Sequence, residues 1–378
     1  MEQFPRSSSR SSRHASDQQA PHERSRTNRQ TTEQRRAAGS HRSPANKGAR
    51  TDSAAKEQAP TRPKSRYIPA LDGLRTLAVV AVVLYHLNLT WAQGGLLGVT
   101  IFFVLSGYLI TRLLLNEIAK TGRIDLKSFW IRRIRRLFPA VVTVVVVTCA
   151  LCTVFNHVML TKMRPDILPS LLFFNNWWQI MQDVSYFNAL GDPSPLTHFW
   201  SLAIEEQFYL IWPPLLLAMV SVHMSKPNTR RVVLGLAAVS AVAMMVLYNP
   251  ATDPSRVYYG TDTRVFSLLL GAWMAFIPDR DLAPARLVRH LGLDRLAGAG
   301  KHDKSKSDTA EAATTKPSEL ARFWSSPASI DLMGVVGLVG LAAMVALTNG
   351  YTAFQYRGGT LLCSILTLMV IAACVQPQ

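Results

Sequence analysis

The feature that most constrains this chain is a series of apolar windows long enough to cross the hydrocarbon core of a bilayer. A core of about 30 Å takes about 20 residues of helix, and a helix satisfies its own backbone hydrogen bonds in lipid. The windows begin near Ile68, Leu96, Pro139, Phe199, Val232, Val265, Ile330 and Thr360. The sequence therefore predicts an all-α integral membrane protein with about eight transmembrane helices.

A further apolar stretch, Ile167 to Met181, carries asparagines and tryptophans in its middle. At about 15 residues it is shorter than the roughly 20 that a crossing helix needs. We therefore expect a short re-entrant or interfacial helix here, with the segments before and after it on the same side of the membrane.

Positive charge is concentrated in a few segments. The formal net charge is +17, although 48% of the residues are hydrophobic. Residues 1–66 hold twelve Arg and three Lys against six acidic residues, which predicts a disordered tail before a membrane domain at 67–378. The tail has no aromatic platform for nucleic acid and leads into a membrane span, so attraction to anionic lipid is the favoured interpretation.

Three later segments, Lys120 to Arg136, Lys226 to Arg231 and Asp279 to Arg322, are also basic, and the alternate connections contain few Lys or Arg. Because cytoplasmic loops carry the excess of Lys and Arg, the pattern predicts a multi-pass protein with its N-terminus in the cytoplasm. Residues 279–327 are expected to form a flexible cytoplasmic loop.

Ionisable residues inside the first window are candidates for a functional site. Arg75 and His86 lie eleven residues apart, so on a helix they face the same way to within about 20° and are displaced by about 16 Å. Asp72 lies on nearly the same face. Because each such group costs about 2.5 kcal/mol or more inside a bilayer, the stripe should face a protein interior or a water-filled cavity. Alternatively, Asp72 and Arg75 satisfy one another near the surface and His86 lies among the headgroups.

The fourth window contains two adjacent carboxylates, Glu205 and Glu206. They face directions about 100° apart on a helix, so they should enter different environments. Ser201 and Tyr209 lie four residues either side of Glu205 and are its expected helix-local partners, which leaves Glu206 to face elsewhere. Acidic residues at this depth favour a functional role over a purely structural one.

Other motifs allow two interpretations each. The run Arg132 to Arg136 has four guanidiniums that could bind phosphates, or it is simply a basic cytoplasmic loop. The glycines of the second span, Gly94, Gly95 and Gly98, favour helix packing over space for a ligand. Asp262 and Arg264 could pair with each other. The four cysteines indicate neither a disulfide framework nor a metal site.

Together these stretches resemble the acyltransferase-3 family of integral membrane O-acyltransferases, which modify bacterial cell-surface glycans and lipids. The segment Ile68 to His86 resembles its first-helix pattern of Arg, ten residues and His. The segment Gly98–Arg112 resembles the family's FFxLSGYLI helix, and Arg132–Pro139 resembles its RxxRL-P motif. The segment Trp200–Pro213 resembles its WSLxxEEQFYLxWP motif, and Tyr259–Gly271 resembles its YxGTDTRxxxLLxGA motif.

The resemblance implies a bacterial plasma-membrane enzyme that moves an acyl group, most often acetyl, from cytoplasmic acyl-CoA to an envelope-glycan hydroxyl. His86 would be the general base or a transient acyl carrier, with Glu205 and Glu206 as further catalytic candidates. The implied donor-binding residues are Arg75, Asp72, Arg133, Arg136, Ser106 and Tyr108. The implied acceptor-binding residues are Trp200, Ser201, Tyr209, Asp262 and Arg264.

This chain departs from the family at its C-terminal end. Family members generally have about ten spans, and some append an extracellular SGNH-type esterase domain; both the last spans and that domain are expected to be missing here. A separate extracellular domain is therefore an expected partner. The competing interpretations are a transporter or flippase, whose charged stripe would carry an ion, and an inactive fragment of an acyltransferase.

Overall fold

The computed structural model describes residues 68–187, 193–291, 323–324 and 326–376, and within these ranges every regular element is a helix. The elements are α1 (Pro69–His86), η1 (Thr90–Leu97), α2 (Gly98–Thr121), α3 (Leu126–Phe155), α4 (His157–Leu171), α5 (Asn175–Met181), η2 (Pro195–His198), α6 (Phe199–Ser221), α7 (Lys226–Leu247), α8 (Ser255–Tyr259), α9 (Thr261–Ala275), η3 (Asp279–Asp281), α10 (Pro284–Leu291), α12 (Pro327–Leu347), η5 (Gln355–Gly359) and α13 (Thr360–Cys374).

All eight predicted windows form helices, which confirms an all-α, multi-pass membrane protein. Six helical segments of the described chain are long and apolar enough to span a bilayer: α1, η1 with α2, α3, α7, α12, and η5 with α13. The other two windows are α6, which has the length but contains Glu205 and Glu206, and α9, which has only 15 residues.

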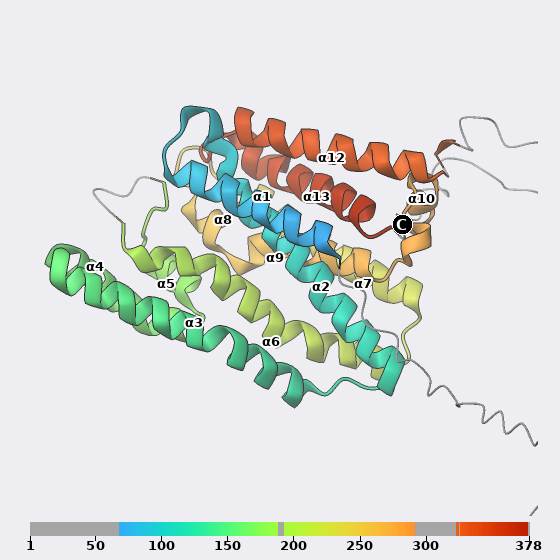
Figure 1. The fold of residues 1–378 in the computed structure, drawn as a ribbon, viewed down its shortest axis with the longest axis horizontal. Helices are drawn as coiled ribbons and strands as arrows, with labels where there is room; N and C mark the ends of the chain where they lie inside the picture. The colour runs from blue at the N-terminus through green and yellow to red at the C-terminus, as the bar shows by residue number, and fades with distance from the viewer. Residues whose placement is uncertain (1–67, 188–192, 292–322, 325, 377–378) are drawn as a thin grey trace, which may run out of the picture. The chain divides into compact units, whose positions relative to one another are not determined.

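The stretch Ile167 to Met181 does not cross as one helix. It is divided between the end of α4 and the whole of α5, with Phe173 at a positive φ of 53° in the break. α4 lies beside α3, and α5 packs against α6 (Figure 1). The single short helix expected here is therefore two, because the break lets the Asn-rich α5 bury its amides against neighbouring elements.

Close glycine contacts hold the centre of the bundle together. α9 packs between α2 and α7, and α12 pairs with α13 (Figure 1). Gly107 of α2 lies against the Leu268 carbonyl of α9, while Gly271 of α9 lies against the Val104 carbonyl of α2. The glycines of η1 and the start of α2 likewise lie against backbone carbonyls of α1 and α12, which confirms that they serve packing: Gly94, Gly95 and Gly98.

The expected flexible loop begins with ordered structure, which corrects its boundary. Residues 279–291 form η3 and α10, and Asp279 accepts two hydrogen bonds from the Arg112 guanidinium, both 2.6 Å long. This ion pair joins η3 to α2 because the planar guanidinium matches a carboxylate fork. Residues 292–322, which make up most of the remaining loop, and the predicted tail at 1–66 lie outside the described residues.

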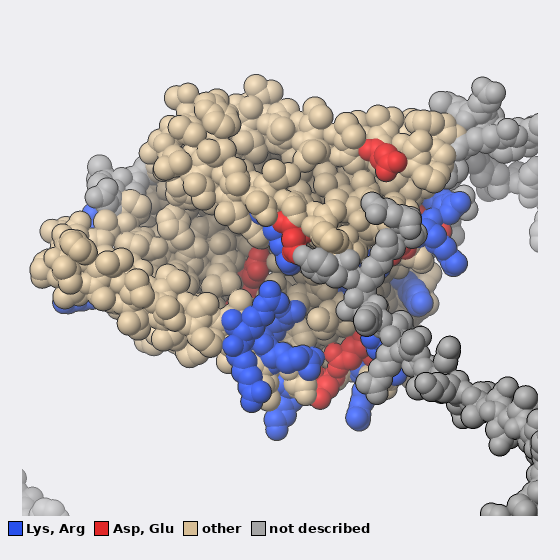
Figure 2. Space-filling model, in the orientation of Figure 1, with Lys and Arg blue, Asp and Glu red and all other residues tan. Residues whose placement is uncertain are grey.

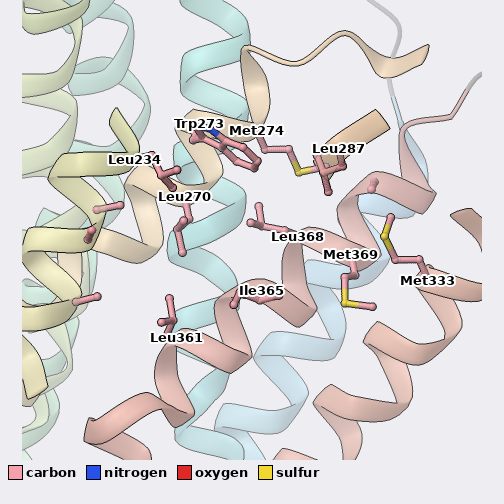
Figure 3. Close-up of a pocket in the computed structure, with 14 residues that line it drawn as sticks. Leu234, Leu270, Trp273, Met274, Leu287, Met333, Leu361, Ile365, Leu368 and Met369 are labelled. Carbon is pink, nitrogen blue, oxygen red and sulfur yellow. The ribbon is translucent and has the colours of Figure 1, made fainter. Parts of the chain in front are cut away.

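Two concave features differ in chemistry. A cavity of about 370 Å³ between α7, α9 and α13 is lined by apolar side chains such as Leu270, Met274 and Leu368 (Figure 3). It presents no ionisable group. The face shown in Figure 2 is instead hollowed between α1 and α3, with acidic side chains inside the hollow and Lys and Arg gathered at one end.

Candidate functional site

The first polar cluster begins on α1 with an ion pair. Pro69 starts the helix, Asp72 occupies its first turn, and Arg75 Nη1 lies 2.8 Å from Asp72 Oδ1. The Arg75 side chain is 38% exposed and that of Asp72 is 44% exposed, so the pair lies at an accessible surface. Asp72 and Arg75 therefore satisfy one another near the surface, which is the alternative interpretation that the sequence left open.

Glu205 of α6 connects this pair to two other helices. Its carboxylate accepts hydrogen bonds from the Tyr209 hydroxyl, at 3.3 Å, and from Ser106 of α2. The positive charges of Arg75 and Arg133 both act on it. The i,i+4 partnership with Tyr209 is confirmed, but Ser201 donates to the His198 carbonyl at 3.4 Å instead.

Arg133 is the one guanidinium of the α3 run that faces this cluster. It stacks over the rings of Phe129 and Tyr209, with its Cζ 5.6 and 5.4 Å from the ring centroids. Arg133 is half-buried, whereas Arg132, Arg135 and Arg136 are exposed. Helical periodicity alone does not single out Arg133, because Arg136 lies three residues further on nearly the same face; the contact with the Tyr209 ring of α6 does.

Local sequence sets where α3 begins, and so where Arg133 points. The Asp125 carboxylate caps the helix by accepting from the Ser128 amide at 3.0 Å and from the Ser128 hydroxyl at 2.6 Å. These hydrogen bonds lower the pKa of Asp125, which keeps the cap ionised.

Glu206 lacks the Tyr209 and Ser106 hydrogen bonds of Glu205 but lies near the same Arg133, so its predicted separation from the Glu205 partners is only partial. Its Oε1 atom is buried and has no hydrogen-bond partner, although the charge of Arg133 acts on the group. A buried carboxylate oxygen without a donor costs free energy, so it is available to a ligand hydroxyl or amide.

The second cluster surrounds His86 at the other end of α1. His86 Nδ1 lies 2.8 Å from the Val82 carbonyl oxygen, and Nε2 lies 3.4 Å from the Tyr186 hydroxyl. A carbonyl oxygen only accepts, so in the neutral ring Nδ1 carries the proton and Nε2 presents its lone pair. The backbone of α1 thus fixes the tautomer that suits a base or nucleophile. A second imidazole, His198, packs edge-on against this ring with centroids 4.7 Å apart.

Sequence reasoning did not assign Tyr186 or His198 to the site. Tyr186 follows α5, and its amide is held by the Ser255 hydroxyl at 2.7 Å. Its position depends on contacts between segments 69 residues apart, and no local pattern predicts it. For His198 the sequence does contain a signal, because this ionisable residue directly precedes the Phe199–Trp200 pair that begins the fourth apolar window.

Arg264 does not pair with Asp262, which corrects that interpretation. Residues two apart on a helix point in nearly opposite directions. Asp262 faces outward and binds Arg256 at 2.9 Å, whereas Arg264 is fully buried and donates to Thr100 Oγ1 at 3.2 Å. Its Nε and Nη1 atoms have no acceptor.

Aromatic rings enclose the Arg264 guanidinium. Its Cζ lies 5.0 Å from the Tyr258 ring centroid and 5.8 Å from that of Trp200. Trp200 is itself buried, and the Tyr186 ring lies 4.6 Å from that of Tyr258. This aromatic layer therefore connects the buried cation to the His86 cluster.

Tyr108 lies apart from both clusters. Its hydroxyl accepts from Arg112, the residue that binds Asp279, so it belongs to the junction of α2 with η3. Among the described residues, no group of three or more His, Cys, Asp or Glu side chains is placed to hold a metal ion.

The two clusters lie on one face of α1, separated by about 16 Å along the helix. One presents guanidiniums suited to phosphate, and the other presents a neutral imidazole nitrogen suited to proton or acyl transfer. This arrangement can bind an elongated anionic donor at one end and react with its far end at the other.

Comparison with known proteins agrees with acyl-transfer chemistry. Residues 68–377 match the family described as "Acyltransferase domain". Peptidoglycan O-acetyltransferase OatA of Listeria monocytogenes is 43% identical over 318 residues, which cover 84% of this chain and 45% of the relative. YrhL of Bacillus subtilis, named provisionally as a peptidoglycan O-acetyltransferase, is 41% identical over 83% of this chain and 44% of its own length. The chain thus spans less than half the length of these relatives. No solved structure matches it.

Proposed function

Because this chain belongs to the acyltransferase-3 family, we propose that it moves an acyl group, specifically acetyl, from acyl-CoA to a hydroxyl of a cell-envelope glycan such as peptidoglycan. The relatives named above supply the reaction class, and the two clusters on α1 supply places for a donor and a reacting group. The observation that carries the proposal is the geometry of α1, with the Asp72–Arg75 pair at one end and His86, in a fixed tautomer, at the other.

The donor binds at the cluster around Arg75. Arg75, oriented by Asp72, and Arg133, packed over the rings of Phe129 and Tyr209, contact the phosphates of CoA. Exposed Arg136 adds long-range attraction at the entrance. The extended pantetheine arm passes Ser106 and Glu205 and brings the thioester toward His86.

His86 acts as a transient acyl carrier. Its Nε2 lone pair attacks the thioester carbonyl, forming an N–C bond as the C–S bond breaks. The departing thiolate takes up the Nδ1 proton, which the Val82 carbonyl had held in place. Glu206, with its unpartnered oxygen, and Glu205 line the path of the arm.

The acceptor approaches from the His86 end. Tyr186 offers a half-buried aromatic surface of the kind that packs against sugar rings, whereas Trp200, expected to bind the acceptor, is buried behind it and only supports the Tyr186 ring. Ser201 is half-buried on α6 and Asp262 is exposed on α9. Arg264, which keeps two N–H groups without an acceptor, polarises an acyl or acceptor oxygen that reaches it.

The orientation follows from charge. Lys and Arg gather at the end of α2 and the start of α3 (Figure 2). We place that end in the cytoplasm, where acyl-CoA is found, and the His86 end outside. A separate extracellular domain is the proposed partner for delivery to the glycan.

The test is transfer of radiolabel from [14C]acetyl-CoA to purified peptidoglycan in membranes that contain the full chain. His86→Ala should abolish transfer, whereas His157→Ala, at an exposed histidine that begins α4, should leave it unchanged. Both variants are compared at equal amounts of folded protein, measured by size-exclusion chromatography.

Label in the wild type that disappears only in His86→Ala supports an acyltransferase that uses this residue. Equal transfer in the wild type and in His86→Ala would refute the assigned role. Wild-type protein that is folded and binds acetyl-CoA but transfers nothing would refute autonomous activity.

A further inference from the structure

His198 is a second imidazole beside His86 whose ring the local structure does not require. It directly precedes α6, and that helix begins without a side-chain cap hydrogen bond. The Ser201 hydroxyl bonds to the His198 backbone carbonyl, not to its ring. Any residue could supply that carbonyl, so the imidazole needs another explanation.

The geometry places this ring next to the reacting atom of the proposed acyl carrier. The His86 and His198 centroids are 4.7 Å apart at an interplanar angle of 86°. Nε2 of His86 is already directed toward the Tyr186 hydroxyl at 3.4 Å. A hydroxyl group that approached an acyl group on this nitrogen would therefore lie on the Tyr186 side of His86, with the His198 ring beside it.

The protonation state also suits a proton acceptor. Although His198 reaches the surface at this end of the bundle, desolvation by the surrounding protein lowers its pKa, and the neighbouring His86 lowers it further. A lowered pKa keeps the ring neutral at neutral pH, with one nitrogen free to accept a proton.

We infer that His198 is a further catalytic residue, the general base that takes the proton of the acceptor hydroxyl in the second half of the reaction. This inference rests on the proposed function, in which His86 carries the acyl group. The acceptor O–H bond breaks as His198 takes the proton, and the oxygen forms the new C–O bond. The C–N bond to His86 then breaks, its electron pair returns to the ring, and the proton passes from His198 to His86, which restores both neutral imidazoles.

The test separates the two half-reactions in the detergent-solubilised full chain. The protein is labelled with [14C]acetyl-CoA, unreacted donor is removed, and loss of label is followed in three media. These are buffer alone, a peptidoglycan disaccharide, and hydroxylamine, a neutral amine nucleophile that needs no base. The variants are His198→Gln and the control His157→Gln.

His198→Gln should acquire label like the wild type but lose it to water and to the disaccharide about 100-fold more slowly, in the range typical of general-base catalysis. Hydroxylamine should discharge wild-type and variant protein at rates within about twofold of one another, since only base-dependent acceptors are affected. The His157→Gln variant should match the wild type throughout.

Discharge of His198→Gln to water and disaccharide at the wild-type rate would overturn the inference while leaving the proposed function intact. Equal slowing with hydroxylamine would also overturn it, because that pattern indicates a structural role. If the wild-type protein acquires no label, the proposed acyl carrier is wrong and this inference is wrong with it.

Discussion

Replacing Gly107 by Ala should separate the two helices at the centre of the bundle. A Cβ atom built at this position would lie 1.9 Å from the Leu268 carbonyl oxygen of α9, far inside the ordinary contact range that begins at 3.4 Å. The contacted atom belongs to the backbone of a rigid helix, so no side-chain rotation can relieve the clash. Because Gly271 makes the reciprocal contact with the Val104 carbonyl, α2 and α9 must move apart along the whole contact.

The expected cost follows from that movement. Overpacking a well-packed core usually costs about 1–3 kcal/mol, and a clash with backbone belongs at the upper end of that range. At roughly 2–4 °C per kcal/mol for a chain of this size, the unfolding temperature should fall by about 6–12 °C. Tryptophan fluorescence during heating of the detergent-purified protein measures the unfolding temperature.

Gly235 provides the matched control. It lies in α7 with nothing within 4 Å of its ideal Cβ position. Gly235→Ala should leave the unfolding temperature unchanged or raise it slightly, since Ala is favoured over Gly in a helix by about 1 kcal/mol. An unchanged unfolding temperature in Gly107→Ala, or an equal fall in Gly235→Ala, would refute the close approach of α2 and α9.

Three further predictions concern the site. Arg133→Ala should raise the KM for acetyl-CoA by about 10–100-fold, as expected for loss of a charge-assisted hydrogen bond, whereas exposed Arg136→Ala should change it by less than about threefold; steady-state kinetics with equal effects would contradict the distinction. Arg264→Met should leave the unfolding temperature equal or higher, because it removes a buried cation with no counter-charge, yet lower acetyl transfer about tenfold or more; a less stable variant would show that the guanidinium is structural. The lowered pKa of His198 means that the folded state binds fewer protons there than the unfolded chain, so its contribution to stability is present above the ordinary His value of about 6.5 and is lost as pH falls below it. Unfolding temperatures from pH 7.5 to 5.5 should therefore fall more steeply for the wild type than for His198→Gln, and parallel curves would argue against the shift.

The predicted roles of individual residues followed from helical geometry where partners were close in sequence. The Asp72–Arg75 and Glu205–Tyr209 pairs are separated by three and four residues, so a helix brings them together whatever surrounds it. The same rule makes an Asp262–Arg264 pair unfavourable, because residues two apart on a helix point in nearly opposite directions, so the predicted pair was wrong.

Long-range packing decided which residues of each motif meet. The α3 run offers four arginines, and only the contact with α6 selects Arg133, through the Tyr209 ring. Tyr186 reaches His86 from a segment 100 residues away, and Arg112 binds a carboxylate 167 residues away. No periodicity in the sequence contains these contacts, because each depends on how several helices are placed together.

The sequence by itself determined that this chain is a helical membrane protein, where its spans lie, and which face of α1 carries Arg75 and His86. These properties depend on hydropathy and on 3.6 residues per turn, both of which are local. Only the tertiary structure decided that Glu205 and Arg133 join Arg75, and that His198 and Tyr186 join His86. Helices in a bilayer choose their neighbours by close packing and buried hydrogen bonds, and those choices involve the whole bundle at once.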